Sequence, residues 1–174
     1  MHPGRRDALI LGGVGLAAAA AGALFGALAL QARSGAAKLL AASFDDLSGT
    51  RRRLLEWQGR VILCNFWATW CAPCREEIPH LVAAQQQYSR SGVQIVGIGI
   101  DSADKIREFS RSFGINYPIL IADAAAIDLM RGLGNRSGGL PYTVVFDRSG
   151  SLVHHKLGPL TREELRQVLE RLLR

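Results

Sequence analysis

The chain has 174 residues, with 21 basic and 15 acidic residues and a formal net charge of +6. This length allows one globular domain of ordinary size and a short appendage. The charges are scattered apart from the run Arg51-Arg52-Arg53, which between apolar neighbours is typical of a solvated edge strand. The sequence carries no DNA- or RNA-binding motif, so we expect no nucleic-acid partner.

The appendage is expected at the N-terminus, where residues 8–30 carry no charge and are almost all Ala, Gly, Leu, Ile and Val. A helix of that length reaches across a hydrocarbon core of about 30 Å. The length favours a retained membrane anchor over a secretion signal, although Ala27-Leu28-Ala29 offers a cleavage site. Arg5 and Arg6 before the span favour an internal N-terminus. We therefore predict residues 1–32 as a single anchor in the inner or cytoplasmic membrane, with the C-terminal domain outside the cytoplasm; the alternative is a soluble periplasmic domain after cleavage.

Residues 33–42, rich in Ala, are predicted as a linker, and residues 43–174 as the globular domain. The domain should open with a hairpin over 44–53 that turns at Ser48-Gly49. A strand over 61–67, a helix from about Pro73 to Arg90 and a strand over 93–100 follow. Next come a helix through Ile106 and Phe113, a short extended segment over 117–121 and a brief helix that ends near Met130.

The C-terminal part should form a second hairpin, with strands over 142–146 and 151–156 around the turn sequence Asp147-Arg148-Ser149-Gly150. Thr161-Arg162-Glu163-Glu164 is a capping box that opens the last helix. Strands that alternate with helices, followed by a hairpin and a helix, predict an α/β fold whose mixed central sheet is covered by helices on both faces.

The most informative motif is Cys71-Ala72-Pro73-Cys74, placed where an apolar strand gives way to a helix. Pro73 suits a first helical turn, so Cys71 lies at the helix N-terminus, where the helix dipole lowers the pKa of a thiol. Positions three apart on a helix are close enough for a disulfide after a small adjustment. So small a ring stabilises a fold little. The motif therefore predicts a disulfide that forms and breaks during function.

The cysteines allow other interpretations. A zinc half-site would need about four ligands, and the chain has no second CxxC and no suitably spaced His pair. A copper metallochaperone could use Cys71, Cys74 and one of His154 or His155, since soft thiolates suit Cu(I). A peroxiredoxin-like peroxidase would need Thr and Arg partners that the sequence does not offer. Cys64, within an apolar run, is predicted to be a buried and inert core residue.

Three segments together resemble the membrane-anchored thioredoxin-like proteins of the TlpA/ResA type. The first runs from Asn65 to Pro79, the second is Gly139-Leu140-Pro141-Tyr142-Thr143 and the third is Phe146-Asp147-Arg148-Ser149-Gly150. The resemblance covers residues 44–174. It implies a thioredoxin-like fold with an extra strand and helix before the proline loop.

The resemblance also assigns roles to residues. Pro141 aligns with the family's cis-proline, whose turn would bring the backbone of Leu140 beside Cys71, so that a substrate segment can pair with it. Glu77 aligns with an acidic residue that exchanges protons with the resolving thiol, and it can replace the buried Asp of thioredoxin, which is Asn65 here. Catalysis would thus involve Cys71, Cys74, Glu77 and Pro141, and substrate docking would involve Trp70, Ala72, Pro73 and Leu140.

These observations predict a thiol:disulfide oxidoreductase that reduces disulfides in partner proteins without a cofactor or metal. The nucleophile would be Cys71, and Cys74 would resolve the mixed disulfide. Ala72-Pro73 lacks the His that strong oxidants place between the thiols, which favours a reductant. By resemblance, the substrates would be apocytochrome c or copper-site assembly factors, and a thiol electron donor in the membrane would regenerate the reduced form.

Overall fold

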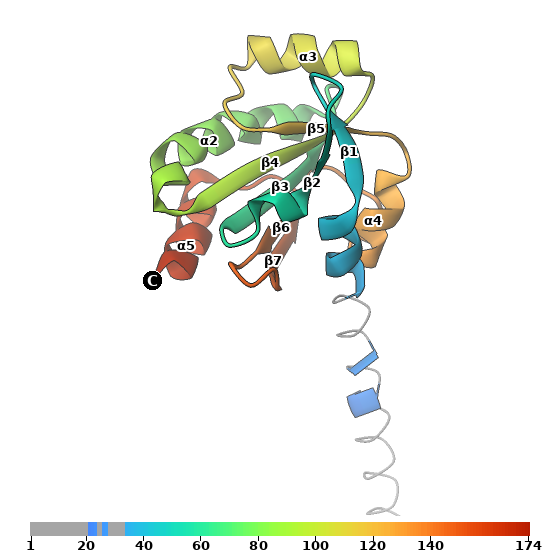
Figure 1. The fold of residues 1–174 in the computed structure, drawn as a ribbon, viewed down its shortest axis with the longest axis vertical. Helices are drawn as coiled ribbons and strands as arrows, with labels where there is room; N and C mark the ends of the chain where they lie inside the picture. Colours follow the sequence, from blue (N-terminus) through green and yellow to red (C-terminus); the bar gives the residue numbers. More distant parts are fainter. Residues whose placement is uncertain (1–20, 24–25, 28–33) are drawn as a thin grey trace, which may run out of the picture.

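The computed structural model describes residues 21–23, 26–27 and 34–174 (Figure 1). Most of the predicted span over 8–30 lies outside these residues. Within the part of the chain that is described, no helix is both long and apolar enough to cross a membrane.

A seven-stranded mixed sheet forms the centre of the domain, as predicted. Strands β3, β4 and β5 are parallel to one another, and the other neighbours pair antiparallel in the order β2-β1-β5-β4-β3-β6-β7. The strands are β1 Ser43–Asp46, β2 Arg51–Arg53, β3 Val61–Trp67, β4 Val93–Ile100, β5 Ile119–Ala122, β6 Tyr142–Phe146 and β7 Leu152–Leu157. Every residue of β3 is buried, because helices cover both faces of this central strand.

Helices lie on both sides of the sheet (Figure 1). The elements are α2 Ala72–Tyr88, α3 Ala103–Ser112, α4 Ala126–Gly132 and α5 Arg162–Leu173, with single 3₁₀ turns at Leu54–Trp57 and Ser89–Ser91. Side chains of α2 and α5 share one apolar cluster on the sheet, and α4 belongs to a separate cluster on the opposite face. The capping box predicted at Thr161 is present, with Thr161 and Glu164 bonded to each other's backbone N–H.

The segment predicted as a linker is instead a helix over residues 34–41 that packs on the core. Leu39 is completely buried, and Ala36 and Leu40 are nearly so, in the cluster that also holds α4. A Cβ atom on Gly35 would lie 2.1 Å from the carbonyl oxygen of Gly132 in α4. The linker prediction was wrong because this burial depends on a contact with a helix almost a hundred residues away.

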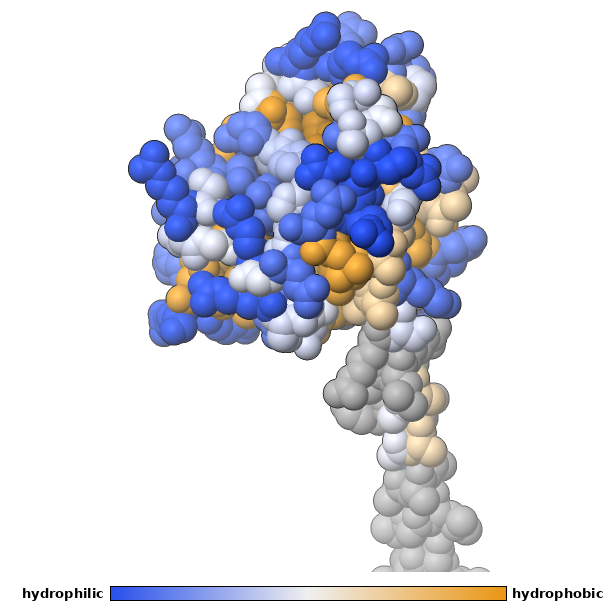
Figure 2. All heavy atoms as spheres, viewed as in Figure 1, coloured by the Kyte–Doolittle hydropathy of each residue, from blue (hydrophilic) through white to orange (hydrophobic). Residues whose placement is uncertain are grey.

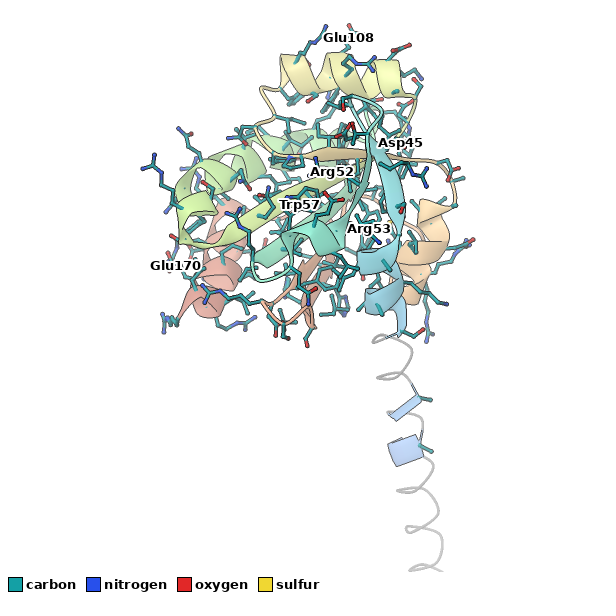
Figure 3. The ribbon with its side chains drawn as sticks, in the orientation of Figure 1. Asp45, Arg52, Arg53, Trp57, Glu108 and Glu170 are labelled. Carbon is teal, nitrogen blue, oxygen red and sulfur yellow. A yellow bond between two sulfur atoms is a disulfide. The ribbon has the colours of Figure 1, made fainter. Side chains whose placement is uncertain are left out.

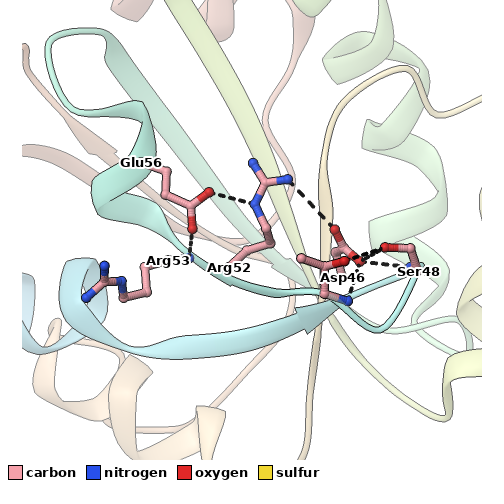
Figure 4. Close-up of polar contacts among 6 residues, drawn as sticks. Asp46, Ser48, Arg52, Arg53 and Glu56 are labelled. Atoms are coloured by element: carbon pink, nitrogen blue, oxygen red, sulfur yellow. Dashed lines mark hydrogen bonds and ion pairs between the residues drawn. The ribbon is translucent and has the colours of Figure 1, made fainter.

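The hairpin of β1 and β2 confirms the predicted turn, with Gly49 at φ +83°. Its basic strand β2 lies at the edge of the sheet, as expected. Arg52 and Arg53 lie on this strand (Figure 3). Arg52 donates a 2.6 Å bond to Glu56 and lies 3.8 Å from a carboxylate oxygen of Asp46, while the backbone N–H of Arg53 donates to Glu56 (Figure 4). Part of the charge of this run is therefore balanced locally. Hydrophilic residues cover most of this side of the molecule (Figure 2).

Candidate active site

The two cysteines of the predicted motif lie at the junction of β3 and α2. Cys71 is the N-cap of α2, and its Sγ accepts a 3.3 Å hydrogen bond from the backbone N–H of Cys74. The two residues form a disulfide with their Cα atoms 5.3 Å apart. Cys74 is fully buried, whereas Cys71 keeps 5% of its surface exposed. Cys71 is thus the more accessible of the two residues.

The local sequence creates a positive environment for Cys71. The first turn of α2 holds no acidic residue, and Pro73 occupies a position where a missing N–H costs nothing. The unpaired N–H groups and the dipole of the helix therefore favour a thiolate at its N-terminus once the disulfide is reduced.

Glu77 lies on the same helix, three residues beyond Cys74, and is only 1% exposed. Its Oε1 accepts a 2.7 Å hydrogen bond from the Asn65 amide, and its Oε2 accepts a 2.8 Å bond from the backbone N–H of Leu160. Burial raises the pKa of the Glu77 carboxyl to about 7, although both hydrogen bonds act to lower this pKa. A carboxyl with such a pKa can both take up and release a proton near neutral pH.

Asn65 on β3 and Thr143 on the neighbouring strand β6 are buried polar residues that belong to the same hydrogen-bond network as Glu77. They face each other in the strand register, and the Asn65 amide donates to the Thr143 hydroxyl over 3.0 Å. The sequence indicates a role for Asn65, but it gives no prediction for Thr143 or for the backbone of Leu160. The signal available was a single polar residue within each of two otherwise apolar strands.

The predicted docking residues Trp70, Ala72 and Pro73 are neighbours of the two cysteines in the chain. The Leu140-Pro141 peptide bond is cis, as the resemblance implied, and the side chain of Leu140 packs against the cluster that contains both cysteines. Trp70 is 70% exposed, Ala72 is exposed and Pro73 is half-buried. An apolar and partly open surface thus borders the sulfur atoms.

The remaining candidate residues lie apart from this site. Cys64 is completely buried, and burial raises the pKa of its thiol well above the usual range, in keeping with an inert core residue. His155 packs near Tyr142, whereas His154 is half-buried on the α5 side of β7. Among the described residues, no group of three or more His, Cys, Asp or Glu side chains is arranged to hold a metal ion.

Comparison with known proteins identifies the family. The redoxin family profile matches residues 35–172. The chain belongs to the redoxin family. The chain is 31% identical over 127 residues to the thiol-disulfide oxidoreductase ResA of Geobacillus thermodenitrificans, an alignment that covers 72% of this chain and 71% of that protein. It is 32% identical over 132 residues to the thioredoxin-like protein YneN of Bacillus subtilis, covering 74% of each chain.

Solved structures of similar proteins agree. A thiol:disulfide interchange protein of the thioredoxin family from Chlorobium tepidum superposes with a TM-score of 0.69 at 28% identity, over 76% of this chain and 93% of its own. A secreted thiol-disulfide isomerase from Corynebacterium glutamicum superposes with a TM-score of 0.68 at 26% identity, over 76% and 83%. The fold is therefore thioredoxin-like, and the chain is a thiol-disulfide oxidoreductase of the ResA type.

Proposed function

We propose that this redoxin-family protein reduces disulfides in partner proteins, with Cys71 as nucleophile, Cys74 as resolving thiol and Glu77 as the proton acceptor of Cys74. The observation that carries the proposal is the order of three residues along the start of α2: Cys71 with 5% of its surface exposed, Cys74 fully buried, and the buried Glu77 carboxyl with a pKa of about 7. Each position suits one step of thiol–disulfide exchange.

In the first step, the Cys71 thiolate attacks one sulfur of a substrate disulfide. A Cys71–substrate disulfide forms, and the other substrate sulfur leaves as a thiolate that takes a proton from solvent. The positive end of α2 favours the attacking thiolate. Leu140, Trp70, Ala72 and Pro73 form the docking surface in this proposal, and the backbone of Leu140 pairs with an extended substrate segment.

In the second step, Cys74 transfers its thiol proton to the Glu77 carboxylate and attacks the sulfur of Cys71. The Cys71–Cys74 bond forms, and the second substrate sulfur leaves as a thiolate, so the substrate gains the two electrons that the cysteine pair loses. When a donor later reduces the pair, protonated Glu77 returns its proton to Cys74. A pKa near 7 allows both transfers at neutral pH.

The proposed location is the outer side of the cytoplasmic membrane, with residues 1–32 as anchor. The uncharged stretch over 8–30 supports an anchor, and a reductant is useful where disulfides persist. The substrates we propose are cysteine pairs of apocytochrome c or of copper-site assembly factors, and a membrane thiol protein is the proposed electron donor.

The pH dependence of turnover tests the role of Glu77. If Glu77 exchanges protons with Cys74, Glu77→Gln should remove the rate transition near pH 7, while Glu76→Gln at an exposed neighbouring position should leave it in place.

Two thiols that form a disulfide reversibly, without bound metal in the purified protein, would support the oxidoreductase mechanism. One equivalent of copper or zinc that blocks thiol labelling would instead support a metallochaperone.

A further inference from the structure

The connection between β3 and α2 is Ala68-Thr69-Trp70, directly before Cys71. Among the described residues, this tripeptide makes one side-chain hydrogen bond, from the Thr69 hydroxyl to the Oδ2 atom of Asp101. Asp101 follows β4 and precedes α3, more than 30 residues further along the chain. The Thr69–Asp101 contact therefore joins the loop before Cys71 to the segment that leads into α3.

Asp101 is itself held in place. Its Oδ1 atom accepts a 2.7 Å hydrogen bond from the backbone N–H of Ser102 and lies 3.3 Å from the ammonium of Lys105. The Asp101 side chain is 9% exposed, whereas Lys105 is 67% exposed. The Thr69 hydroxyl is the main cause of a lowered pKa at Asp101, so the carboxyl is ionised at neutral pH and is a strong acceptor.

From these contacts we propose that Thr69 and Asp101 are positioning residues, which fix the loop so that Trp70 and Cys71 face a polypeptide substrate in one orientation. The inference rests on the proposed function, because it concerns docking at the Cys71 site. Neither residue takes part in bond formation. Trp70 is the most exposed large apolar side chain of the described residues. Among those residues, no side-chain hydrogen bond other than the Thr69–Asp101 contact holds this loop.

The physical consequence is preorganisation. A loop that is ordered before the substrate arrives loses less conformational entropy on binding, so a polypeptide substrate is held more tightly. A small disulfide reagent needs only the thiolate and no docking surface. Loss of the Thr69–Asp101 contact should therefore raise KM for polypeptides and leave the reaction with small disulfides unchanged.

The test compares the reduced full-length wild type with Thr69→Val, which removes one hydroxyl at nearly constant volume. With insulin as polypeptide substrate and dithiothreitol to re-reduce the Cys71–Cys74 pair after each turnover, we expect KM to rise about threefold to tenfold while kcat stays within about twofold. The second-order rate with 5,5′-dithiobis(2-nitrobenzoic acid) should not change. Thr69→Ser, which restores the hydroxyl, should restore KM.

Two further variants keep the test decisive. Asp101→Asn retains an acceptor without charge and should give a smaller rise in KM; it replaces Thr69→Val if that variant does not fold. Asp104→Asn, in the first turn of α3 and 94% exposed, loses the same charge but not the bond to Thr69, and it should match wild type. An unchanged KM in Thr69→Val and Asp101→Asn, or equal slowing with both substrates, would overturn the inference. A wild type that reduces neither substrate would instead refute the proposed function.

Discussion

The side-chain amide of Asn65 donates a 2.7 Å hydrogen bond to the carboxylate of Glu77, and both residues are buried. The resemblance to thioredoxin aligns Asn65 with the buried aspartate of that protein, and here Asn65 donates to the carboxyl that we propose in place of that acid. The site thus keeps one buried carboxyl, held by a neutral donor. The hydrogen bond also opposes the rise in the pKa of Glu77 that burial causes.

Replacing Asn65 by Ala is therefore expected to raise the pKa of Glu77 above about 7, because the lost hydrogen bond favoured the ionised form. The measurement is an NMR titration of isotopically labelled glutamate. Thr143→Val serves as a control, since Thr143 contacts Asn65 but makes no hydrogen bond to Glu77, and it should cause a smaller shift. An unchanged Glu77 pKa in Asn65→Ala would contradict the electrostatic account.

The raised pKa of Glu77 also predicts how the stability of the folded protein depends on pH. The pKa of its carboxyl rises from the ordinary 4.5 to about 7 on folding. Below pH 4.5 the carboxyl is protonated in both the folded and the unfolded protein, so its ionisation does not lower the stability of the fold. As pH rises to about 7, only the unfolded chain ionises, and the folded protein loses about 3 kcal/mol of stability.

Urea denaturation of the oxidised protein between pH 4 and 8 checks this prediction. The stability of Glu77→Gln relative to wild type should increase by about 3 kcal/mol between pH 4.5 and 7 and then level off. Glu76→Gln, at an exposed position in the same helix, provides the matched control. A difference between Glu77→Gln and wild type that does not vary with pH would show that Glu77 has an ordinary pKa.

The packing of helix 34–41 predicts an unusual effect for Gly35→Ala. In a helix this change normally stabilises by up to about 1 kcal/mol. Here the new methyl group would meet the carbonyl of Gly132, so we expect a loss of about 1–3 kcal/mol in urea denaturation. Ala37→Ser, at an exposed position of the same helix, should change stability by only about 0.5 kcal/mol. A stabilised Gly35→Ala variant would mean that the helix does not pack there.

Much of this fold follows from local patterns, and the departures have a common physical cause. The apolar run of β3, the turn glycines and the capping box at Thr161 act within a few residues, and the sequence predicts each of them. The burial of helix 34–41 depends on the approach of Gly35 to Gly132, and the Ala-rich composition of this helix fits a linker equally well.

In the candidate site, the Cys71–Cys74 pair is evident from its spacing. The contacts of Asn65 with Thr143, Glu77 with Leu160 and Thr69 with Asp101 join distant segments, so only the fold reveals them.

The proposed membrane anchor makes a prediction about location. A reporter that is active only after export, fused after Arg174, should be active and should stay with the membrane fraction after a high-salt wash. An inactive reporter would reverse the proposed orientation. Recovery of the active fusion in the soluble periplasm would show that the apolar stretch is a cleaved signal.

The most direct test of the mechanism is covalent trapping. Cys74→Ser removes the resolving thiol and leaves the more accessible Cys71, so attack on a substrate disulfide should stop at the mixed disulfide and accumulate a covalent complex. Cys71→Ser should accumulate none, because the sulfur of Cys74 is fully buried within α2. Non-reducing gels followed by mass spectrometry would detect the complex and identify the partner. We predict trapping by Cys74→Ser alone; equal trapping by both variants, or by neither, would contradict the assignment of Cys71 as nucleophile.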